Sequence, residues 1–196
     1  MAAIVYLHGF RSSPASVKAQ RLQAAVAALP EGQRPRLHVP SLAHRPAQAI
    51  AAVAAWVDRH AAATTLTFVG SSLGGFYATH LAERFGARAV LVNPAVHPER
   101  DLAPWLGVQT NLYTGEAFEV IPAHFAELAA LAVGRVTRPE RYFLLVESGD
   151  EVLDYREAVA HFSGAWQYVR GGGDHTFTEF AAQIPAILRF AGVTAA

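Results

Sequence analysis

The sequence predicts an α/β fold in which about six mostly parallel strands form one sheet with helices on both faces. Short apolar runs alternate along the chain with longer segments that carry apolar residues at helical spacing, which is the pattern of a doubly wound sheet. Most of the apolar runs lack polar alternate residues, as expected for parallel strands buried on both faces. Glycine or proline stands at many of the joins between the runs.

The individual elements follow from these patterns. Strands are predicted at residues 4–7, 37–39, 66–69, 89–92, 142–146 and 168–169. Helices are predicted at residues 16–29, 46–60, 72–85, 154–162 and 178–190. Pro46 suits the first turn of its helix, and Gly86 follows the third helix where a C-terminal cap is needed.

Residues 93–139 interrupt the alternation of strands and helices. This segment contains five prolines and the aromatic residues Trp105, Tyr113 and Phe118, and we predict one helix at about 122–133 with irregular structure elsewhere. A long loop in a compact domain is usually a functional lid, although a packed excursion over a sheet edge would have the same composition. We therefore expect a single domain, residues 1–196, with a cap or lid inserted at about 93–139.

Composition excludes several classes of function. The 196 residues are 52% hydrophobic and carry 16 basic and 16 acidic residues, so the chain has no basic field for nucleic acid. The absence of cysteine removes disulfides, thiolate metal sites and cysteine nucleophiles. The N-terminus lacks the basic region of a signal peptide, and the longest uncharged helical segment, residues 46–57, is too short to span a bilayer. These features predict a cytoplasmic protein with no membrane partner, either a monomer or a small homo-oligomer.

The motif that carries chemistry is Gly70-Ser71-Ser72-Leu73-Gly74, which matches G-x-S-x-G. It lies directly after the predicted strand 66–69 and before a helix, the context that the motif requires. Ser72 occupies the nucleophile position, whereas Ser71 fails the spacing. A sharp strand-to-helix turn exposes the hydroxyl of this serine, and the helix N-terminus favours negative charge that develops beside it.

A serine nucleophile needs a general base oriented by a carboxylate. His175 is the last of nine histidines and follows Gly171-Gly172-Gly173-Asp174 after the final strand, at the sheet edge where ligands bind in open α/β folds. Four carboxylates after strand 142–146 compete for the orienting role, and Asp150 follows a glycine at the turn. Asp154 is the main rival, although its position also fits the N-cap of the next helix.

Two backbone N–H groups are predicted to form an oxyanion hole. One belongs to Leu73, the residue after the nucleophile, and the other to Phe10 in the loop after the first strand. His8, in the same loop, is interpreted as a brace for the loop rather than as the catalytic base.

At these residues the sequence resembles the α/β-hydrolase superfamily and, more narrowly, the small bacterial esterases of the YqiA/YcfP type. The resemblance covers nearly the whole chain and is carried by residues 6–14, 70–78, 91–96, 111–115, 149–155 and 172–177. It implies a shortened sheet, no cofactor or metal, and esterase or thioesterase activity on short acyl chains, with acyl-CoA among the candidate substrates. The triad positions implied by the resemblance are Ser72, Asp150 and His175, the same residues that the spacing selects.

The resulting hypothesis is a serine hydrolase that cleaves small-molecule acyl esters or thioesters through an acyl-enzyme. Trp105, Tyr113 and Phe118 are expected to shape an apolar acyl pocket, which would tolerate a broad range of substrates. An acyltransferase or carbon–carbon hydrolase on the same triad, and a non-catalytic binding module, remain as alternatives. No pattern of clustered metal ligands favours a metal hydrolase.

Overall fold

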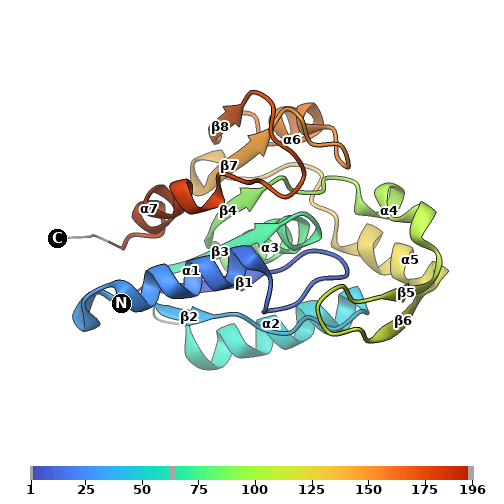
Figure 1. Ribbon diagram of the computed structural model, residues 1–196, viewed down its shortest axis with the longest axis horizontal. Coiled ribbons are helices and arrows are strands. Elements are labelled where there is room, and N and C mark those ends of the chain that lie inside the picture. Colours follow the sequence, from blue (N-terminus) through green and yellow to red (C-terminus); the bar gives the residue numbers. More distant parts are fainter. Residues whose placement is uncertain (1, 62–64, 194–196) are drawn as a thin grey trace.

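One six-stranded sheet organises the computed structural model, which describes residues 2–61 and 65–193 (Figure 1). The strand order is β2-β1-β3-β4-β7-β8, and every pair of neighbours is parallel. The strands are β1 (Ala2–Leu7), β2 (Arg36–His38), β3 (Thr65–Ser71), β4 (Arg88–Val92), β7 (Tyr142–Glu147) and β8 (Trp166–Arg170). Each corresponds to one predicted apolar run, so the predicted parallel sheet is confirmed.

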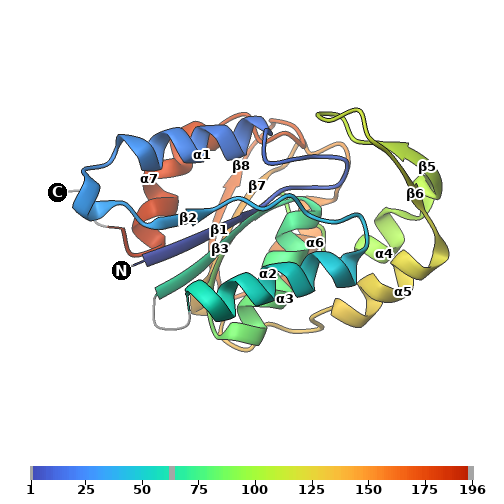
Figure 2. The same ribbon diagram turned by 90° about the horizontal axis from the view of Figure 1, so that it is seen from below.

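Helices cover both faces of this sheet. In Figure 2, α1 (Val17–Ala28) and α7 (Phe180–Phe190) lie on one face, and α2 (Pro46–His60) and α3 (Leu73–Phe85) lie on the other. The short helix α6 (Tyr155–His161) belongs to the second layer. Among residues 2–61 and 65–193, no helix combines the length and apolarity needed to cross a membrane.

The central strands β1, β3, β4 and β7 are mostly apolar and buried on both faces, whereas the edge strands β2 and β8 are partly exposed. In β1, Ile4 and Tyr6 pack toward α1 and α7, whereas Val5 and Leu7 pack toward α2 and α3. All four side chains are at most 1% exposed. Burying such side chains on both faces of the sheet supplies the main favourable contribution to folding.

The segment between β4 and β7 is more ordered than the sequence predicts. It contains α4 (Pro98–Asp101), the antiparallel hairpin β5 (Gly107–Thr110) and β6 (Ala117–Val120), and α5 (Pro122–Leu131). The helix was predicted, but the expectation of irregular structure is wrong for the hairpin. Figures 1 and 2 both place the hairpin beyond the carboxyl ends of the sheet strands.

Long-range contacts explain why the hairpin escapes prediction. A four-residue strand pair is marginal in isolation and needs outside support. Asn111, in the hairpin loop, donates through Nδ2 to the carbonyl of Ser12 at 2.8 Å, and the N–H of Leu112 donates to the carbonyl of Arg11 at 2.9 Å. The hairpin is thus fastened to the loop after β1, about 100 residues earlier in the chain.

Candidate active site

Ser72 stands at the sharp turn between β3 and α3. Its backbone angles are φ 55° and ψ −123°, a region that side-chain-bearing residues rarely adopt and that often marks functional sites. The turn is held by hydrogen bonds on both sides. The N–H of Ser72 donates to the carbonyl of Val92 at 3.0 Å, and its carbonyl accepts from Gly75 at 2.8 Å and from Ala95 at 3.1 Å. The surrounding backbone therefore fixes the direction in which the Ser72 hydroxyl points.

The two glycines of the motif allow three pieces of backbone to meet at this turn. A side chain at Gly70 would collide with the backbone of Gly74, and a side chain at Gly74 would collide with the backbone of Leu7 at the end of β1. The spacing of the motif thus reflects close approach of β1, β3 and α3 around Ser72.

The structure brings Ser72, His175 and Asp150 into one hydrogen-bonded chain. His175 Nε2 lies 3.1 Å from Ser72 Oγ, and His175 Nδ1 lies 2.9 and 2.8 Å from the two carboxylate oxygens of Asp150. Because an ionised carboxylate only accepts hydrogen bonds, it selects the tautomer with the proton on Nδ1. Nε2 is then free to accept the proton of the serine hydroxyl.

The geometry also separates the competing carboxylates. The side chain of Asp150 is 2% exposed, and its Oδ1 additionally accepts the N–H groups of Val152 and Leu153 at 2.9 and 2.8 Å. Asp154 instead caps α6 by accepting from the N–H of Arg156 at 3.0 Å. Of these two candidates, only Asp150 contacts the imidazole in the described chain.

Asn93 connects the loops that carry the histidine and the aspartate, and sequence reasoning assigned it no role. It follows β4 with a positive φ of 39°, a conformation that asparagine tolerates better than most residues. Its Nδ2 donates to the carbonyls of Asp174 and His175 at 3.0 and 3.3 Å, while its Oδ1 accepts from the N–H of Glu147 at 3.0 Å. The sequence signal that could have identified Asn93 was a polar residue at the carboxyl end of a buried strand.

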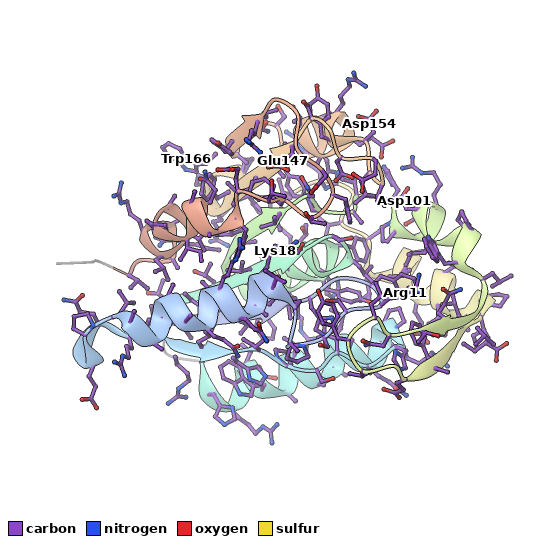
Figure 3. All side chains as sticks on the ribbon, in the orientation of Figure 1. Arg11, Lys18, Asp101, Glu147, Asp154 and Trp166 are labelled. Atoms are coloured by element: carbon purple, nitrogen blue, oxygen red, sulfur yellow. The ribbon has the colours of Figure 1, made fainter. Side chains whose placement is uncertain are left out.

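Glu147 also contacts the loop that carries His175. It is fully buried, pairs with Arg170 Nη1 at 2.8 Å, and accepts from the N–H of Asp174 at 2.9 Å (Figure 3). Gly173, at φ 76°, packs so closely on this carboxylate that a side chain there would overlap it. Glu147 was one of the four competing carboxylates, and the structure places it behind the histidine loop rather than against the imidazole.

Replacing Asn93 by alanine is expected both to slow catalysis and to weaken the fold. The change removes three hydrogen bonds and leaves the N–H of Glu147 without its partner, which costs about 1–3 kcal/mol of unfolding free energy. Displacement of His175 should lower kcat about 10- to 100-fold. Denaturant unfolding and steady-state kinetics on an activated ester measure both effects.

Thr79→Val is the matched control for this experiment. It also removes a buried hydrogen bond, from Thr79 Oγ1 to the carbonyl of Gly75 at 2.9 Å, but touches no triad side chain. Its kcat should stay within about twofold of the wild type. Equal losses of kcat in the two variants would show that Asn93 acts through stability alone.

Phe10 and Leu73, the predicted oxyanion donors, both lie next to Ser72. Leu73 begins α3, where backbone N–H groups have no acceptor within the helix. The loop before Phe10 approaches so closely that a side chain at Gly9 would come within 3.2 Å of Ser72 Cβ. Within residues 2–61 and 65–193, neither predicted N–H donates to another protein group. Both N–H groups are thus free to donate to a molecule bound beside Ser72.

His8 braces the loop after β1, as its sequence context suggested. The N–H of Leu42 donates to His8 Nε2 at 3.2 Å, so Nδ1 carries the proton and donates to the carbonyl of Gly9 at 3.0 Å. Burial lowers the pKa of His8, and the hydrogen bond to Gly9 only partly opposes this effect. The neutral imidazole is therefore a structural part of the loop.

A cavity of about 500 Å³ opens in front of Ser72 and His175. Of the three aromatic residues expected to shape it, Tyr113 lies in its wall. Trp105 and Phe118 are absent from that wall in the described structure and instead pack edge-on against Phe10, with ring centroids 6.1 and 5.8 Å away. Their contribution to the cavity is therefore to support Phe10.

Comparison with solved structures places this architecture among known folds. A mouse protein, α/β-hydrolase domain-containing protein 10, superposes with a TM-score of 0.72 and 16% identity, covering 97% of this chain and 89% of that one. An esterase domain from a Rhodothermus marinus protein superposes with a TM-score of 0.68 and 16% identity, covering 97% and 86%. The chain therefore has the α/β-hydrolase fold.

Sequence comparison identifies the family. A UPF0227 protein of Shewanella sp. (strain ANA-3), Shewana3_2292, is 27% identical over 129 residues, which cover 62% of this chain and 63% of that protein. The alignment thus spans less than two thirds of the relative. The model of the uncharacterised protein family UPF0227 matches residues 3–192. This chain, which has the α/β-hydrolase fold, therefore belongs to the uncharacterised protein family UPF0227.

Proposed function

We propose that this protein is a serine hydrolase that cleaves carboxylic esters or thioesters of short acyl chains through an acyl-enzyme. The observation that carries the proposal is the hydrogen-bonded chain from Ser72 through His175 to Asp150. A strained nucleophile, a base in contact with it and a buried carboxylate behind the base are the three parts that serine catalysis requires.

In the first half of the reaction, Ser72 Oγ attacks the carbonyl carbon while its proton passes to His175 Nε2. Asp150 stabilises the imidazolium that forms, and the N–H groups of Leu73 and Phe10 stabilise the negative oxygen of the tetrahedral intermediate. Collapse of this intermediate breaks the bond to the leaving group. His175 Nε2 returns its proton to the leaving alcohol or thiol, which leaves Ser72 acylated.

In the second half, a water molecule attacks the acyl-enzyme. His175 Nε2 takes a proton from this water, and the N–H groups of Leu73 and Phe10 again stabilise the oxyanion. As the second intermediate collapses, the bond between the acyl carbon and Ser72 Oγ breaks, His175 Nε2 returns its proton to Oγ, and the carboxylic acid leaves. The apolar wall residues of the cavity include Leu112 and Tyr113 from the hairpin loop, and we assign the segment 93–139 the role of a cap over the acyl chain.

Labelling with a fluorophosphonate tests the proposal directly, because such probes phosphonylate only an activated serine. We expect stoichiometric labelling of the whole protein, with peptide mass mapping assigning the adduct to Ser72. Boiled protein should remain unlabelled. A folded protein that takes up no probe, or takes it up at another serine, contradicts the proposed chemistry.

A further inference from the structure

The charged side chains that line the cavity in front of Ser72 are basic. Among the described residues that line it, two are basic, Lys18 and Arg21, and none is a carboxylate. The chain as a whole has equal numbers of basic and acidic residues, and Lys18 is its only lysine. The two cations are three residues apart on α1, so they lie on the same face of that helix.

Lys18 is only partly engaged by the protein. Its Nζ donates to the carbonyl of Thr176 at 2.6 Å, which uses one of its three donors (Figure 3). Burial lowers the pKa of Lys18, and the more distant carboxylates of Asp174, Glu147 and Asp150 partly oppose this effect. A cation that has lost part of its hydration without gaining a paired anion is costly, and a bound anion would offset that cost.

The three opposing carboxylates are committed elsewhere. Glu147 pairs with Arg170, Asp150 contacts His175, and Asp174 accepts from the N–H and hydroxyl of Thr176. Within residues 2–61 and 65–193, no carboxylate comes within 4.0 Å of the cationic nitrogens of Lys18 or Arg21. Both cations of the cavity therefore lack an ion-pair partner among the residues that the structure describes.

Some of the basic side chains outside the cavity are paired with carboxylates, and others are not. Arg45 pairs with Glu127, Arg100 with Asp101 and Glu157, and Arg138 with Glu140. Arg189 is exposed on α7, does not line the cavity, and pairs with no carboxylate in the part of the chain that the structure describes, so it offers a comparison for Arg21. What distinguishes Lys18 and Arg21 is that they line the cavity that holds the nucleophile.

We propose that the substrate carries, in addition to its scissile ester, an anionic group that Lys18 and Arg21 bind. This inference rests on the proposed function and specifies its substrate class: an acyl ester with a carboxylate or phosphate-type group at a distance from the reacting carbonyl. The ester lies at Ser72, the connecting chain packs on apolar wall residues such as Val17 and Phe180, and the anion lies against α1. Arginine and lysine are the side chains best suited to bind such oxyanions.

Paired esters that differ only in charge test the proposal. The first pair is 4-nitrophenyl hydrogen adipate and its neutral methyl ester. The second is 4-nitrophenyl 5-phosphonopentanoate and its neutral dimethyl phosphonate. All four release the same alcohol, so the ratio of kcat/KM for anionic over neutral ester reports recognition of the charge, and the two pairs distinguish carboxylate from phosphate-type recognition.

We expect the wild-type ratio to exceed one in at least one pair. Lys18→Met should lower this ratio about tenfold, and Arg21→Gln about 3- to 10-fold because Arg21 is more exposed. Loss of the Lys18 contact to Thr176 would slow hydrolysis of both esters of a pair by the same factor. This factor cancels in the ratio of their kcat/KM values. Arg189→Gln, the matched change of net charge, should leave the ratio unaltered. Raising the salt concentration to 1 M should reduce the wild-type ratio by screening.

The possible failures are distinguishable. Ratios at or below one, or ratios unaltered in both variants, overturn the anion site while Ser72-dependent hydrolysis of neutral esters still supports the proposed function. If no ester is hydrolysed, calorimetric titration of Ser72→Ala with the same four compounds decides. The anion site is supported without the activity if the anionic member of a pair binds more tightly than the neutral member and if adding Arg21→Gln weakens this binding. Equal binding of the two members of each pair overturns the site.

Discussion

Ser72→Ala is expected to lower kcat/KM for 4-nitrophenyl butyrate by about 10⁴- to 10⁶-fold, because it removes the atom that forms the acyl-enzyme. The 3.1 Å contact between Ser72 Oγ and His175 Nε2 is the geometric basis of this expectation. Residual hydrolysis would come from the oxyanion donors and from His175 acting on water. A spectrophotometric assay of nitrophenol release measures the effect.

Ser71→Ala is the informative comparison, because Ser71 precedes the nucleophile and is itself buried at the end of β3. Its loss of activity should be smaller by at least about 100-fold, since Ser71 contributes no atom to the reaction. Both variants should unfold within about 4 °C of the wild type, because neither creates a large cavity. Ser72→Ala with most of its activity intact would remove Ser72 from the mechanism.

Asp150→Asn is expected to lower kcat about 10⁴-fold, because the amide no longer selects the tautomer that leaves Nε2 free to accept a proton. Both Asp150 oxygens lie within 2.9 Å of His175 Nδ1, so an NH₂ group in place of one oxygen would face this nitrogen or force the ring to turn. The remaining amide oxygen can still accept the N–H groups of Val152 and Leu153. The loss should therefore appear in kcat with the fold preserved.

Asp154→Asn is the matched control for Asp150→Asn, because it makes the same chemical change four residues away. Asparagine caps a helix about as well as aspartate, so α6 should keep its N-terminus and kcat should fall less than about twofold. A larger loss in Asp154→Asn than in Asp150→Asn would transfer the orienting role to Asp154 and would require a different histidine geometry.

Features that depend on local sequence could be predicted well. The apolar runs identified the central strands because strands buried on both faces leave few polar alternate residues, and the partly exposed edge strands β2 and β8 were identified from shorter apolar runs. The spacing of Gly70, Ser72 and Gly74 identified the turn, since backbone collisions at both glycines exclude larger residues. The position of His175 after the final strand followed from chain order, because parallel strands bring their carboxyl ends to one edge.

Features that depend on contacts between distant segments could not be predicted. The β5–β6 hairpin needs the loop after β1, to which Asn111 and Leu112 fasten it. Asn93 acquires its role only when β4, β7 and the histidine loop meet, and Glu147 only when Arg170 and Gly173 approach it. The basic lining of the cavity could not be predicted either, because the zero net charge of the chain does not show where its cations lie in space.

The route of the chain between β4 and β7 makes the segment that we propose as the cap modular. The two strands are hydrogen-bonded neighbours, with Val92 opposite Leu145, so the 49 residues between them leave and return at one place in the sheet. The separation of their ends is set by strand pairing and not by the length of the intervening chain. Since each doubling of a loop costs only about 0.6 kcal/mol of closure entropy, this segment can be lengthened, shortened or exchanged while β3, β7 and β8 keep Ser72, Asp150 and His175 in register. A grafted segment would need to keep Asn93 and the aromatic packing on Phe10, and the residues between these fixed points are the ones that can be varied to change the substrate range.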